Sequence, residues 1–127
     1  MLTYNQTFEK GVLRDLGNLF PDLDEKINRR LENVRDLMVP FRRRDVYRWQ
    51  MRGSYSIKDV LPAMVPDLSY EGLEIADGIA AMQAYCDMCE MSPSEELDRL
   101  RASMLDYCRL DTLAMVKILD ELQKIRI

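Results

Sequence analysis

Two residues one helical turn apart, Tyr107 and Asp111, carry the clearest chemistry in this sequence. They lie in a segment whose apolar residues recur at helical spacing, and Asp111 falls on the same face as this apolar stripe. No cation stands three or four positions away, so no residue of the same helix pairs with the Asp111 carboxylate. The stripe consists of Leu97, Leu100, Met104, Cys108, Met115, Ile118, Leu122 and Ile125.

A carboxylate on an inward face is costly unless another group satisfies it. A metal ion in a cleft would satisfy Asp111, and Tyr107 would face the same cleft. The alternative is that Asp111 caps a second helix that begins after a break at Leu110. The third residue of that helix would be Ala114, so no capping box supports the alternative. The pattern alone favours neither interpretation.

A second acid, Glu9, stands where a short extended start at residues 2–4 gives way to a helix. An acid in the first turn of a helix interacts favourably with the helix dipole, and this is a sufficient reason for Glu9 on its own.

A basic segment spans residues 42–52. Its arginines alternate with aromatic residues, a composition that suits a strand of nucleic acid, with phosphates on guanidinium groups and bases stacked on rings. The other interpretation, which we favour from the pattern, is a solvated loop whose arginines pair with surplus acids. The candidate nucleic-acid contacts are Arg42, Arg43, Arg44, Arg48, Trp49 and Arg52.

Composition bounds the functional class. The 127 residues are 47% hydrophobic and 31% charged, which is typical of one globular domain. No apolar run approaches the roughly 20 residues of a membrane span, and residues 1–5 do not resemble a secretory leader, so we expect no membrane partner and a cytoplasmic protein. The net charge of −4 argues against nucleic-acid binding through overall charge, and the lack of histidine excludes a His base from this chain.

The three cysteines do not complete a metal site. Cys86 and Cys89 have Cys-x-x-Cys spacing, but a structural zinc site takes four ligands and only Cys108 remains. Ile79, Met82, Cys86 and Cys89 share one helical face, which favours cysteines packed in the core.

The periodicity predicts a mainly α-helical fold with at most one or two short strands. Asp22 with Glu25 resembles a capping box, and Ser92 followed by Pro93 and Glu95 indicates a helix start capped by Ser92. The predicted helices cover about 8–19, 22–34, 56–64, 79–89 and 92 to the end, with residues 36–39 as a strand or helix tail and a loop at 67–78.

Several segments in order resemble a known family. They are Tyr4-Asn5-x-x-Phe8-Glu9, Phe20-Pro21-Asp22-Leu23, residues 53–58 with 60–62, Asp77-Gly78, and Tyr107-Cys108-x-x-Asp111 with 112–115. Together they look like the C-terminal part of a bacterial domain family of unknown function in the ribonuclease-H-like superfamily, related to the tyrosine-type DEDD 3′–5′ exonucleases. The resemblance covers essentially the whole chain, and it implies the helical C-terminal portion of a ribonuclease-H-like α/β domain.

The resemblance also implies roles. Asp111 would be the last metal-binding acid, Glu9 would occupy the second-motif position, and Tyr107 would orient the attacking water. Mg²⁺ or Mn²⁺ would be the cofactor and nucleic acid the substrate. The first Asp-x-Glu motif of the superfamily does not occur in residues 1–127. We therefore expect one partial domain over 1–127 that is inactive alone and forms homo-oligomers. The alternative is a non-catalytic helical interaction module.

Overall fold

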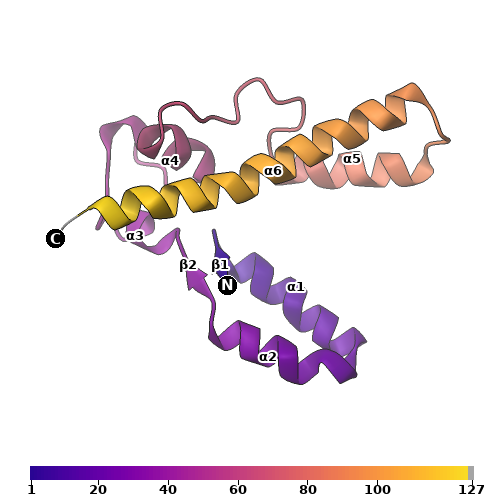
Figure 1. Ribbon diagram of the computed structural model, residues 1–127, viewed down its shortest axis with the longest axis horizontal. Helices are drawn as coiled ribbons and strands as arrows, with labels where there is room; N and C mark the ends of the chain where they lie inside the picture. Colours follow the sequence, from indigo (N-terminus) through magenta and orange to yellow (C-terminus); the bar gives the residue numbers. More distant parts are fainter. Residues whose placement is uncertain (126–127) are drawn as a thin grey trace.

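Helices dominate the computed structural model, which describes residues 1–125, and this confirms the predicted fold class (Figure 1). In that range there are six α-helices and one small parallel sheet of two strands. The elements are β1 (Leu2–Thr3), α1 (Gln6–Leu19), the 3-10 turn η1 (Pro21–Leu23), α2 (Asp24–Glu32), β2 (Arg35–Asp36), α3 (Val39–Arg42), the 3-10 turn η2 (Trp49–Met51), α4 (Ile57–Met64), α5 (Gly78–Glu90) and α6 (Glu95–Lys124).

The sheet joins the two ends of the α1–α2 hairpin. Leu2 lies opposite Arg35 and Thr3 opposite Asp36, and the N–H of Leu37 continues the ladder by donating to the carbonyl of Thr3. The hairpin extends from this short sheet as one arm of the molecule, while α5 and the first half of α6 form a second arm that diverges from it (Figure 1).

The hydrophobic core lies where the second half of α6 packs against α4. Met51, Val60, Leu61 and Ile118 are fully buried there, together with Phe41 from α3. Pro62 interrupts the hydrogen bonding of α4, but the helix is short and well packed. This core fixes the middle of α6, and with it the side chains at positions 107 and 111.

The last helix is continuous from Glu95 to Lys124, so the alternative in which Asp111 caps a second helix is wrong. Its cap is Ser94, whose hydroxyl accepts the N–H of Leu97 at 3.2 Å, and not Ser92 as the sequence predicted. The predicted capping box of Asp22 and Glu25 is also wrong, because Asp22 lies in η1 and no side chain caps α2.

The cysteines differ from their prediction as well. Cys86, Cys89 and Cys108 are all exposed, because α5 buries mainly Ala84 against α6 and turns its Cys86–Cys89 face to solvent. Among the described residues, no helix combines the length and the apolar content that a membrane crossing needs.

Candidate functional site

Asp111 has a hydrogen-bond partner that the sequence did not reveal. The hydroxyl of Tyr70, in the loop between α4 and α5, donates to Oδ1 of Asp111 at 2.7 Å. Tyr70 is only 5% exposed. Burial and then the Asp111 carboxylate raise the pKa of the Tyr70 hydroxyl, which therefore stays protonated and able to donate. Asp111 is half-buried, and its Oδ2 makes no hydrogen bond among the described residues.

The three residues proposed for catalysis meet in one cleft. Glu9 of α1, and Tyr107 and Asp111 of α6, line a cleft of about 420 Å³ at the point where the two arms diverge. The rest of its lining is mixed in polarity and comprises Tyr4, Asn5, Phe8, Ile57, Gly78 and Met115. The fold thus brings together acids from opposite ends of the sequence.

Glu9 is the least satisfied group in this cleft. Its Oε2 is buried and has no hydrogen-bond partner among residues 1–125. Burial is the main reason that the pKa of Glu9 is raised, and the negative charges of Asp36 and Asp111 act in the same direction. The backbone N–H groups of Glu9 and Tyr4 oppose the shift. A proton or a cation at Oε2 would relieve this unfavourable arrangement.

Asp36 of β2 determines where Glu9 lies. Asn5 adopts a left-handed conformation with φ of 73° and does not cap α1 with its own side chain. The Asp36 carboxylate does so instead, accepting the N–H groups of Asn5 at 3.0 Å and Gln6 at 3.1 Å. It also accepts the N–H of Met38 at 3.0 Å. The start of α1 is therefore tied to the neighbouring strand, and Asp36 is used structurally.

Tyr107 lies beside the start of α5. A Cβ at Gly78 would lie 3.9 Å from the Tyr107 hydroxyl, an ordinary van der Waals contact, so Gly78 and Tyr107 are neighbours across this side of the cleft. The ring of Tyr107 packs at a tilt on that of Tyr70, with 6.2 Å between centroids. Burial, followed by the charges of Asp111 and Asp77, raises the pKa of Tyr107. Tyr107 is thus a neutral hydroxyl at neutral pH, able to donate to a water or ligand.

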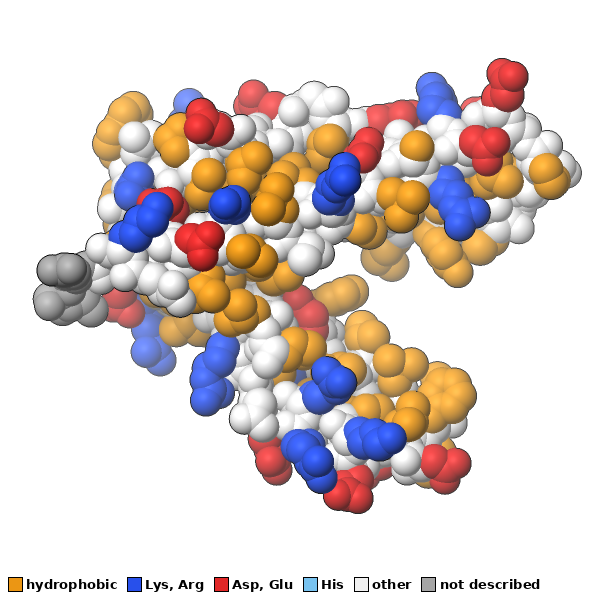
Figure 2. Space-filling view, viewed as in Figure 1, with side chains coloured by type: hydrophobic (Ala, Val, Ile, Leu, Met, Phe, Trp, Pro, Cys, Tyr) orange, Lys and Arg blue, Asp and Glu red, His pale blue; other side chains and the backbone are white. Residues whose placement is uncertain are grey.

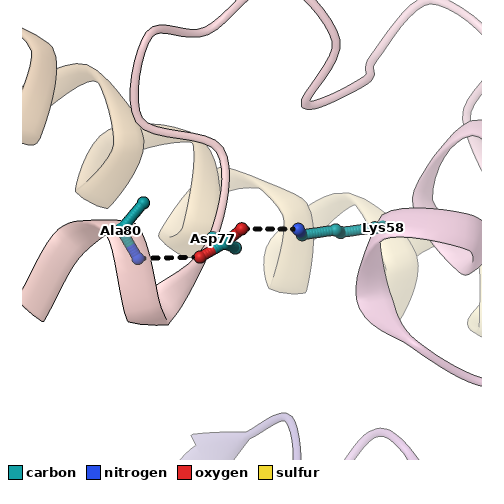
Figure 3. A network of polar contacts seen from close by, with 3 residues as sticks. All are labelled: Lys58, Asp77 and Ala80. Carbon is teal, nitrogen blue, oxygen red and sulfur yellow. Dashed lines mark hydrogen bonds and ion pairs between the residues drawn. The ribbon is translucent and has the colours of Figure 1, made fainter.

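A polar network anchors the start of α5 to α4 (Figure 3). Asp77 caps α5 by accepting the N–H of Ala80 at 2.8 Å, and its other oxygen lies 3.4 Å from Nζ of Lys58. The Ala80 N–H, and then Lys58, lower the pKa of Asp77. This network holds Gly78 against the cleft.

The cleft offers a hard cation only two carboxylate side chains. Glu9 and Asp111 offer carboxylate oxygens, the ligands that Mg²⁺ and Mn²⁺ prefer. Within residues 1–125, no group of three or more Asp, Glu, Cys or His side chains is close enough to hold a metal ion. The residues fit one partly hydrated cation, with most of its coordination left to water.

The basic segment is exposed, and its arginines do not pair with acids as the favoured interpretation proposed. None of Arg42, Arg43, Arg44, Arg48 or Arg52 takes part in an ion pair within the described chain. Arg48 is held by a hydrogen bond to the carbonyl of Ala63 at 3.1 Å. Trp49 is 76% exposed. The guanidinium groups of the other four arginines have no ion-pair partner within the described residues and are exposed, so they could meet an anion.

A groove of about 580 Å³ adjoins the cleft. Arg52, Lys58 and Tyr70 are among its lining residues. Tyr70 therefore contacts this groove on one side and Asp111 on the other. Lys58 lies in the segment 53–58 of the resemblance but was given no role in the site, and Tyr70 was not identified, because both roles depend on contacts between distant segments.

Comparison with known proteins adds one finding. Residues 1–56 match the model of a domain of unknown function, DUF2779. The matched residues hold Glu9, Asp36 and the basic segment, whereas Tyr107 and Asp111 lie outside them. No curated protein and no solved structure matches the chain. The expected resemblance to a domain of unknown function is thus found over the first 56 residues. The description of DUF2779 names no activity.

Proposed function

We propose that this chain carries part of the metal-binding site of a nuclease-like domain in the ribonuclease-H-like superfamily, one that acts on nucleic acid in the intact protein. The observation that supports the proposal is the convergence of Glu9, Tyr107 and Asp111 on one cleft. The buried and unpartnered Oε2 of Glu9 is the kind of atom that a cation satisfies.

Each residue has a distinct part in the proposed site. Glu9 and Asp111 would hold Mg²⁺ or Mn²⁺ from opposite sides of the cleft. Tyr70 keeps Asp111 oriented by occupying its Oδ1, which leaves Oδ2 for the cation. Tyr107 would donate its hydroxyl proton in a hydrogen bond to the water that attacks the phosphate. When bound, a divalent cation lowers the pKa of water and stabilises charge on the phosphate oxygens.

With only two carboxylates in the cleft, the 127-residue chain cannot clamp a water between two metal ions, so we expect it to be catalytically inactive alone. Purified chain incubated with Mn²⁺ and a labelled single-stranded oligonucleotide should leave the oligonucleotide intact. Metal-dependent degradation that Asp111→Asn abolishes would show that the site is complete and that this part of the proposal is wrong.

The proposed nucleic-acid contacts can be tested by binding. Arg43→Ala with Arg52→Ala should weaken the binding of a single-stranded oligonucleotide by roughly tenfold at low salt, since two phosphate contacts are removed. It should also flatten the salt dependence of the binding constant. Arg48 is left in place because it supports Ala63. The matched control replaces two exposed arginines elsewhere, Arg14 and Arg101. If both double variants lose the same affinity for the oligonucleotide, the basic segment is an ordinary surface loop and not a nucleic-acid contact.

A further inference from the structure

The molecular surface is too large for a compact monomer. A folded monomer of 14.9 kDa exposes about 7,000 Å², whereas this chain exposes 9378 Å². The excess is roughly 2,400 Å² per chain. Figure 2 shows where part of it arises, as the two arms diverge and apolar side chains lie along the sides that face one another. Two chains together carry an excess of about 4,800 Å², which lies within the roughly 2,000–5,000 Å² that obligate homodimers bury in total.

The exposed apolar surface is concentrated on two helices. One free stripe runs along α1 and the other along α5, at helical spacing in both cases. Their members are Phe8 (67% exposed), Val12, Leu16 and Leu19 (72%) on α1, and Ile79 (83%), Met82 (67%) and Tyr85 (63%) on α5.

The α1 stripe leads into a groove with a defined chemistry, here called the hairpin groove. It lies between α1 and α2, has a volume of about 340 Å³ and is lined by Leu13, Leu16, Phe20, Leu23, Ile27, Lys26 and Arg30. Its floor is apolar and its only charged lining residues are the two cations. Neither cation forms an ion pair within the described residues.

The α5 stripe has the complementary chemistry. Its exposed apolar residues are followed on the same helix by Asp87 and Glu90, and α5 carries no cation. Glu90 flanks this apolar face, in line with Ile79 along the helix, and Asp87 lies further round the helix, where it accepts the Gln83 amide at 2.8 Å. An apolar helix face with acids to one side of it matches an apolar groove with cations at its rim. The two surfaces stand on different arms, so one chain can offer both at once.

We propose that two copies of this chain form a two-fold dimer in which α5 of each copy packs in the hairpin groove of the other. Met82 and Tyr85 then fill the space beside Phe20 and Leu23. Asp87 and Glu90 lie at the rim with Lys26 and Arg30. The same contact is made twice, once by α5 of each copy. The dimer is therefore closed, and no unpaired copy of either surface remains to bind a third chain.

Charge reversal tests this arrangement more sharply than apolar substitution does. The groove variant Lys26→Glu/Arg30→Glu and the helix variant Asp87→Lys/Glu90→Lys each place like charges at both contacts of their own dimer. We expect each to weaken dimerisation by about tenfold or more, measured by sedimentation equilibrium. Mixing the two variants should restore the dimer. At one contact the acidic groove meets the basic helix, and at the other the unchanged acidic α5 of the groove variant meets the unchanged basic groove of the helix variant.

Restoration on mixing also shows that both variants are folded. The matched control is Leu105→Glu, on an exposed residue of α6 outside both surfaces, which should leave the dimer unchanged. Wild-type chain that remains a 14.9 kDa monomer at tens of micromolar would overturn the proposal and leave the arms to a different protein. A dimer that neither reversal weakens, or that mixing does not restore, would overturn the proposed contacts.

Discussion

Tyr70 and Asp111 are joined by a hydrogen bond of 2.7 Å that links the loop before α5 to the middle of the longest helix. The Tyr70 hydroxyl occupies only Oδ1, so Oδ2 of Asp111 has no hydrogen-bond partner among the described residues. The same tyrosine packs in the core and lines the groove beside the cleft. The hydrogen bond therefore contributes to the stability of the fold and also orients Asp111, the proposed metal-binding residue.

Removing this bond should destabilise the protein. Tyr70→Phe keeps the ring and removes the hydroxyl that donates to Asp111. Hydrogen bonds to charged groups contribute about 1.5–3 kcal/mol, and the half-exposed position of Asp111 places the expected loss near 1–2 kcal/mol. Urea denaturation measures it. Tyr85→Phe, at an exposed residue whose hydroxyl has no hydrogen-bond partner among the described residues, should change the free energy of unfolding little. Equal stability of the two variants would contradict this role for Tyr70.

Asp36 should matter for stability more than its place in a two-residue strand suggests. Asp36→Ala removes the acceptor of three backbone N–H groups at the start of α1 and before α3. We expect a loss of about 2 kcal/mol in the free energy of unfolding, as for other strong helix caps. Asp15→Ala, at an exposed acid in the middle of α1, is the control. If Asp36→Ala costs no more than the control, α1 does not depend on this cap.

The raised pKa of Glu9 predicts a pH-dependent effect of Glu9→Gln. In the folded protein Glu9 binds its proton more tightly than in the unfolded chain, so its contribution to stability falls as pH rises from the ordinary glutamate range through the raised pKa. Glu9→Gln should therefore gain stability over wild type from pH 4 to pH 7. The gain should stay below about 1 kcal/mol, because solvent still screens the side chain. Thermal unfolding of both proteins across this pH range provides the test. A stability difference between Glu9→Gln and wild type that does not change with pH would contradict the prediction.

The exposed cysteines offer a direct probe of the proposed dimer. Cys86 and Cys89 lie on the free face of α5, whereas Cys108 lies on α6. Maleimide labelling of Cys86 and Cys89 should slow as the protein concentration rises through the dimerisation range, relative to Cys108. Labelling rates that do not depend on concentration would mean that α5 remains uncovered.

The sequence predicted features that depend on neighbours along the chain. Helical periodicity located α1, α4, α5 and α6 because the apolar residues of each recur at helical spacing. Periodicity did not predict the cap of α1, because that cap comes from a distant residue: Asp36 accepts the N–H of Gln6, 30 positions before it in the sequence. It also failed for Cys86 and Cys89, because an apolar face predicts burial only if another element covers it.

The candidate site was predicted in part. Helical spacing placed Tyr107 and Asp111 on one face, and the resemblance added Glu9. Tyr70 was not identified, because a loop tyrosine 41 positions away has no periodic relation to Asp111. The favoured interpretation of the arginines was wrong about their pairing with acids, since charge composition does not say which acids lie within reach.

Glu9 and Asp111 are proposed to share one cation site, and Mn²⁺ titration followed by amide NMR is a direct test of this site. Substoichiometric Mn²⁺ should broaden the amide signals around Glu9, Tyr107 and Asp111 first. Glu9→Gln and Asp111→Asn should each abolish this selectivity, and Asp111→Asn keeps an oxygen to accept the Tyr70 hydroxyl. Broadening in the cleft no stronger than around the exposed Glu95, or selective broadening that survives both substitutions, would contradict the account.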